Sequence, residues 1–86
     1  LIAGQAVVAT RIALIAGDDQ ARAALAEQVQ AAADHYAEGE APDSPYAHLA
    51  ALLRACVARL RGEPLPPVPA QFRDLLTILE DEEPSV

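Results

Sequence analysis

Residues 44–62 constrain the fold of this chain most, because a start signal, an unbroken apolar stripe and a stop signal follow one another there. Asp43 or Ser44 can cap the amino end of a helix, and Pro45 suits the first helical position, where its missing N–H is not needed. Gly62 can end the helix. Apolar side chains recur every three or four residues in between, at Tyr46, Leu49, Leu53, Cys56, Val57 and Leu60. The pattern predicts a core-forming helix over residues 45–61.

Two helices are expected before this one, over residues 1–16 and 19–38. The first is apolar on nearly every side and ends at Gly17; along one side we expect Leu1, Ala6, Val8, Ile12 and Ile15. Asp18 or Asp19 can cap the second helix. Its packing stripe consists mostly of small side chains, at Ala21, Leu25, Val29, Ala32 and Tyr36, and its outer face carries polar side chains, including Arg22.

A fourth helix is expected over residues 70–82, after a proline-rich segment at residues 63–69. The segment holds four prolines and should be a stiff, extended spacer. The helix after it presents Phe72, Leu75, Leu76 and Leu79 on one face. We therefore predict an all-α fold, with four helices in two antiparallel hairpins that form a small bundle or a short repeat-like stack.

The length and composition of the chain set limits on its class. Eighty-six residues make one small domain, and the start at Leu1 rather than Met suggests a piece of a larger protein. The chain is 52% hydrophobic but only 3% aromatic, and its apolar content is largely Ala and Leu, which favour helix. Arginine without lysine, together with many alanines, is typical of GC-rich bacterial genomes.

The charge and the cysteine content indicate partners and compartment. A net charge of −7 argues against nucleic acid and anionic lipid as partners, because both need a basic surface. The single Cys56 cannot form an internal disulfide, which favours a reducing, cytoplasmic setting. The apolar start has no basic region before it and is too short and too interrupted to be a signal peptide or a membrane span.

Candidate chemistry is sparse. Ser44, His48 and Asp43 lie close in sequence and could form a nucleophile, a base and an orienting acid, although capping explains Ser44 and Asp43 better. Cys56 lies on an apolar stripe, and only Arg59 could activate its thiol. His35 and Glu38 are three residues apart on one helix, which is too few ligands for a metal site. We expect no catalytic residue, no cofactor and no metal.

Two family resemblances lead to different expectations. Asp43-Ser44 at a helix start superficially resembles an acyl carrier protein, in which the serine carries a phosphopantetheine arm; Pro45 and Ala41-Pro42 depart from that family's pattern. Residues 8–64 resemble tetratricopeptide repeats, on the turn at Gly17-Asp18-Asp19 and the small residues Ala21, Ala23 and Ala24 that follow it. The aromatic positions of the repeat are absent, and Asp34 lies near its proline position. The second resemblance implies stacked helix pairs and a protein-binding role.

The resulting hypothesis is a non-catalytic protein-interaction or scaffolding module that forms a homo-oligomer. The first helix is too apolar for a chain this small to cover, and a large exposed apolar patch usually marks an interface. We expect the interface to involve Ile2, Val8, Ile12, Ile15, Leu25, Val29 and Tyr36. The alternative is a carrier, a small enzyme or an accessory domain that uses Ser44, His48 or Cys56.

Overall fold

The computed structural model describes residues 3–80 and shows an all-α bundle, as predicted. Its helices are α1 (Ala3–Ala16), α2 (Asp19–Ala37), α3 (Pro45–Arg61) and α4 (Arg73–Glu80), and a short 3-10 turn, η1 (Ala70–Phe72), leads into α4. The second and third helices agree with their expected bounds to within one residue, and the first ends at Ala16 as expected. The fourth was expected over residues 70–82, but its α-helical part begins at Arg73, because residues 70–72 form the 3-10 turn. Residues 1–2 and 81–82 of the expected helices lie outside the described residues. The whole measures 40 × 25 × 21 Å.

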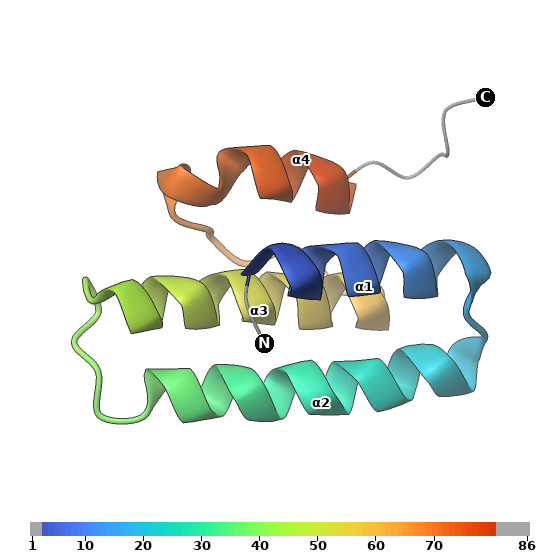
Figure 1. Ribbon diagram of the computed structural model, residues 1–86, viewed down its shortest axis with the longest axis horizontal. Coiled ribbons are helices and arrows are strands. Elements are labelled where there is room, and N and C mark those ends of the chain that lie inside the picture. The colour runs from blue at the N-terminus through green and yellow to red at the C-terminus, as the bar shows by residue number, and fades with distance from the viewer. Residues whose placement is uncertain (1–2, 81–86) are drawn as a thin grey trace.

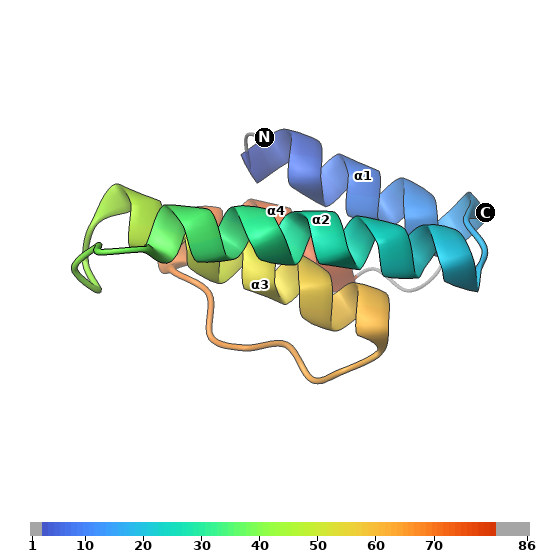
Figure 2. The ribbon, with the colours of Figure 1, turned by 90° about the horizontal axis from the view of Figure 1, so that it is seen from below.

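The first three helices form an up-down-up arrangement, in which α2 runs antiparallel to α1 and α3 runs antiparallel to α2 (Figure 1). The fourth helix differs from the hairpin expected for it, because α4 runs in the same direction as α3. Residues 63–69 stay extended and travel back along α3 before α4 begins (Figure 2). Prolines lack an N–H and fix φ near the extended polyproline value, so this segment stays out of helix and carries the chain back to the start of the bundle.

The helix ends lie where the sequence signals predicted them, and the structure shows which residue caps α2 and which caps α3. The Asp18 carboxylate accepts a hydrogen bond from the Ala21 N–H at 2.8 Å, so Asp18 caps α2. The Ser44 hydroxyl accepts one from the Ala47 N–H at 3.0 Å, so Ser44 caps α3. Gly62 ends α3 at φ +73°, a left-handed conformation that glycine adopts without strain.

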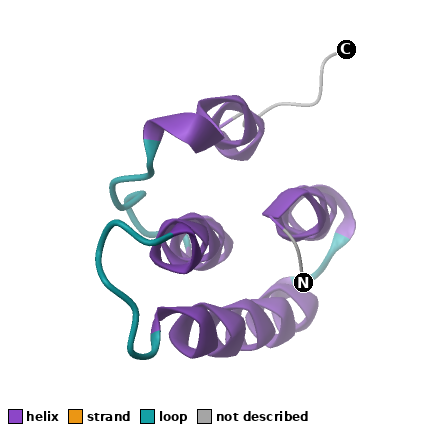
Figure 3. Cartoon of the chain, turned by 60° about the vertical axis from the view of Figure 1, so that its left-hand side comes forward, coloured by secondary structure: helices purple, strands orange, loops and turns teal. Residues whose placement is uncertain are grey.

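The core lies around α3, which α1, α2 and α4 surround (Figure 3). Within α3 the buried residues are Ala50, Leu52, Leu53, Ala55, Cys56, Val57, Ala58 and Leu60. The other helices add Ala6, Val7, Thr10, Ala26, Val29, Ala33 and Leu79. Tyr46 departs from the expected stripe, because its ring is exposed and stacks on Tyr36 with ring centroids 6.0 Å apart. Sequence spacing placed Tyr46 correctly on the helix, but its contact with the Tyr36 ring of α2 leaves it 56% exposed.

We expect Leu53→Ala to lower the free energy of unfolding by about 2–5 kcal/mol, because Leu53 is fully buried and its truncation leaves a cavity. Urea denaturation followed by circular dichroism measures this. Ile78→Ala is the matched control, since Ile78 is 41% exposed, and it should cost about 1 kcal/mol or less. Equal costs for the two substitutions would contradict the assignment of the buried face of α3.

Candidate interaction surface

Helix α1 has two faces of opposite character. Ala6, Val7 and Thr10 are fully buried, whereas Val8, Ile12 and Ile15 are 53%, 60% and 56% exposed. The expected stripe was therefore wrong in one respect, since Ala6 faces the core and does not share the side of the three large aliphatic residues. An ordinary amphipathic surface helix exposes polar side chains, whereas α1 exposes three large aliphatic ones.

Helix α1 is apolar on both its inner and its outer side. The inner side carries Ala6, Val7 and Thr10, and Leu14 also packs against the core. The buried Thr10 hydroxyl donates a hydrogen bond at 2.8 Å to the Ala6 carbonyl of the preceding turn, so Thr10 is buried without an unsatisfied polar group. The three exposed aliphatic residues lie on the opposite side, where Figure 3 shows no other helix of the described chain.

The outer face of α1 is hollowed near its amino end. A shallow depression of about 500 Å³ is lined by Gly4, Gln5, Val8, Ala9 and Ile12. The missing side chain at Gly4 and the methyl group of Ala9 leave the space, and Val8 and Ile12 border it. We call Val8, Ile12, Ile15 and this lining the α1 outer face.

The charge around the α1 outer face differs from that of the chain as a whole. Helix α1 carries no acidic residue, and Arg11 is its one charged side chain, although the chain as a whole has a net charge of −7. The acids of the described residues lie on α2, on α4 and in the connecting segments. A partner can therefore approach α1 without facing a carboxylate of that helix.

The other expected interface residues lie elsewhere. Val29 is fully buried and belongs to the core, so it offers no surface to a partner. Leu25 and Tyr36 are half-buried and pack against the core, and Ile2 lies outside the described residues. The spacing of Val29 marked a buried position correctly, but spacing alone does not separate a face that meets α3 from one that meets another chain.

A second, smaller depression of about 290 Å³ lies between the end of α2 and the start of α3. It is lined by His35, Tyr36, Glu38, Glu40 and Tyr46. The two tyrosine rings are nearly parallel, at 3°, and each comes from a different helix. Their contact fastens this end of the α2–α3 hairpin, which accounts for the exposed Tyr46.

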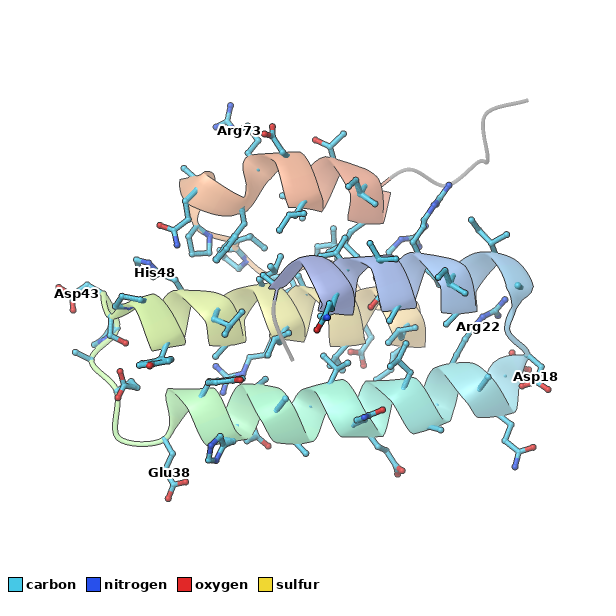
Figure 4. The ribbon with its side chains drawn as sticks, viewed as in Figure 1. Asp18, Arg22, Glu38, Asp43, His48 and Arg73 are labelled. Atoms are coloured by element: carbon cyan, nitrogen blue, oxygen red, sulfur yellow. The ribbon has the colours of Figure 1, made fainter. Side chains whose placement is uncertain are left out.

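Asp43, Ser44 and His48 occupy the amino end of α3, where Figure 4 shows Asp43 and His48 on the outside of the bundle. The Ser44 hydroxyl donates to the Glu40 carboxylate at 2.8 Å and accepts from the Ala47 N–H, so capping uses both its donor and an acceptor site. Cys56 lies eight residues beyond His48, about 12 Å along the helix axis. The structure therefore does not bring His48 and Cys56 together.

The Cys56 thiol lies in the centre of the core, with no exposed surface. Burial raises the pKa of this thiol above its ordinary value, and the Thr10 hydroxyl and the Cys56 backbone offset part of the rise. A reactive cysteine needs the opposite conditions, namely a lowered pKa and access to solvent. Cys56 acts here as a small apolar side chain.

A polar hollow of about 590 Å³ lies where the end of α3 meets the turn between α1 and α2, and its lining includes Arg22 and Arg59. Both arginines bind carbonyl groups at helix ends. Arg22, which we expected on the outer face of α2, instead donates from Nε to the Ala13 carbonyl at 3.2 Å and from Nη2 to the Leu14 carbonyl at 3.1 Å. Figure 4 shows Arg22 beside the turn that joins α1 to α2. Arg59 Nε similarly donates to the Leu79 carbonyl at 2.7 Å. Both arginines satisfy carbonyls at helix ends, where a cation is favoured.

Comparison of the chain with models of protein families, with curated proteins and with solved structures found no match. Within residues 3–80, no three histidine, cysteine or acidic side chains are grouped closely enough to hold a metal ion. None of the helices in that range combines the length and the apolar character that crossing a bilayer requires. The candidate site is therefore defined by geometry alone, and it is the α1 outer face.

We expect the Cys56 thiol of the folded protein to resist modification by an aromatic disulfide reagent at mildly alkaline pH, because it is buried and its pKa is raised. The same chain in concentrated urea should release one equivalent of chromophore at once. Fast labelling without denaturant would show that the thiol is accessible and would contradict the placement of Cys56 in the core.

Proposed function

We propose that this chain is a non-catalytic protein-interaction module that associates through the α1 outer face, with further copies of itself as partner. The observation that carries the proposal is the exposure of Val8, Ile12 and Ile15 on one side of a helix that has no acidic residue. Apolar patches of this kind on small proteins mark interaction sites.

The size of the apolar face sets the strength of association to expect. Burying a Val or Ile side chain completely stabilises by about 1.5–3 kcal/mol, so half-burial of six such side chains in a pair of copies gives about 5–9 kcal/mol. The loss of translational and rotational freedom costs an estimated 4–15 kcal/mol. The two quantities are of the same size, and flanking contacts must supply the surplus. We therefore expect a weak complex, with a dissociation constant in the micromolar range or above.

The non-catalytic part of the proposal rests on the candidate nucleophiles. The Ser44 hydroxyl is engaged by Glu40 and Ala47, and the Cys56 thiol is buried away from His48. The same arrangement gives an acyl-carrier role no support, since a carrier serine must be free to hold its arm. We extend the proposal to a bacterial, cytoplasmic scaffolding role of the tetratricopeptide-repeat kind, which the reduced Cys56 and the helical architecture support.

We expect the weight-average mass of the protein to rise with concentration across the micromolar range, and Ile12→Asp to abolish the rise. A carboxylate at the most exposed position of the α1 outer face would have to be buried without a partner when copies associate. Sedimentation equilibrium or light scattering measures the mass, and circular dichroism confirms that the variant keeps its helices.

The control for that experiment is Ile78→Asp, which places the same charge on an exposed aliphatic residue of α4. This variant should associate like the unmodified chain. A strictly monomeric unmodified protein would exclude self-association, and equal effects of the two substitutions would show that net charge rather than the α1 outer face governs it.

A further inference from the structure

The depression on the α1 outer face has the spacing of a helix-packing hole. Four of its lining residues, Gln5, Val8, Ala9 and Ile12, stand at positions i, i+3, i+4 and i+7. These are the four positions that surround an inserted side chain when two helices pack by knobs into holes. Gly4, the fifth lining residue, adds no side chain that would obstruct the opening.

The same face also provides a side chain of the right kind to enter such a hole. Ile12 is 60% exposed, more than either Val8 or Ile15, and it lies about one helical turn beyond the centre of the depression. Hole and knob therefore share one helix face at a fixed offset. Consider a two-fold axis that passes between two copies of α1, perpendicular to both helices, at the level of Thr10. This axis places the Ile12 of each copy over the depression of the other.

We propose that two copies of this chain pair through α1 in an antiparallel arrangement, with Ile12 of each copy inserted between Gln5, Val8, Ala9 and Ile12 of its partner. This inference rests on the proposed function and specifies its partner and register. In this register Val8 lies opposite Ile12 of the second copy, and Ile15 lies opposite Gln5. The aliphatic side chains of Val8 and Ile12 thus pack against each other across the pair, and Ile15 packs against the flexible stem of Gln5.

Three features favour a second copy over another occupant. An isologous pair uses one surface twice, and the α1 outer face contains both the hole and the knob that such a pair needs. The approaching helices carry no carboxylates, so two chains of net charge −7 meet where their acids are absent. Gly4 has no side chain and Ala9 has only a methyl group, which allows close approach of the two helix backbones. The antiparallel direction sets opposite ends of the helix dipoles side by side.

The register can be tested by disulfide trapping with two single-cysteine substitutions, Val8→Cys and Ile12→Cys, each in the otherwise unmodified chain. The two variants are mixed in equal amounts at a concentration where the protein associates, oxidised mildly, and separated by mass. Random pairing would make half of the cross-linked dimers a mixed disulfide between Cys at position 8 and Cys at position 12. The antiparallel pair predicts a larger share of this mixed disulfide, since positions 8 and 12 face each other. The unmodified chain is the control, because its buried Cys56 should give no cross-link.

The outcomes separate this inference from the proposed function. Predominance of the two symmetric disulfides would indicate parallel helices and overturn the register, while a concentration-dependent mass would leave self-association intact. Association without any cross-link would move the interface away from the α1 outer face and overturn the inference. A monomer that instead binds zwitterionic lipid vesicles, and loses this binding in Ile12→Asp, would assign the face to a membrane surface and overturn both proposals.

Discussion

Eight of the seventeen residues of α3 are buried, and α1, α2 and α4 surround this helix (Figure 3). Leu52, Leu53 and Cys56 have no exposed surface at all. A helix with so wide an apolar surface depends on its neighbours, because most helical stability in proteins comes from tertiary packing. Helices α1 and α2 supply most of the cover for α3, whereas α4 packs against both α1 and α3.

Helices α1 and α2 both bring small side chains into the core. Ala26, Val29 and Ala33 of α2 are buried, and so are Ala6, Val7 and Thr10 of α1. The inner side of α1 also holds a large residue, since Leu14 packs against the core. Because α1 is apolar on nearly every side, packing one side against the bundle leaves the aliphatic Val8, Ile12 and Ile15 exposed on the other.

Local signals in the sequence predicted the helices, their caps and the burial of α3, because each of these depends on residues within a turn of one another. Ser44, Asp18 and Gly62 act where the spacing placed them. Three features that depend on distant residues were not predictable. Arg22 turns toward the carbonyls of α1, Arg59 reaches the Leu79 carbonyl twenty residues away, and α4 runs parallel to α3 because of the path of residues 63–69. The apolar composition of α1 likewise indicated that part of its apolar surface would be exposed. Only the packing of α1 against the bundle shows that this part is the side with Val8, Ile12 and Ile15.

The distribution of charge favours the α1 outer face in the proposed complex. A net charge of −7 makes close approach of two copies unfavourable over most orientations, because acids line α2, α4 and the connecting segments. Two helices, α1 and α3, contain no acid, and α3 is covered by its neighbours. The proposed association is therefore least opposed where α1 meets α1, and repulsion over the rest of the surface would restrict the proposed complex to that contact. Because a face of three aliphatic side chains is small, this repulsion would weigh more in the proposed geometry than it would beside a larger apolar patch.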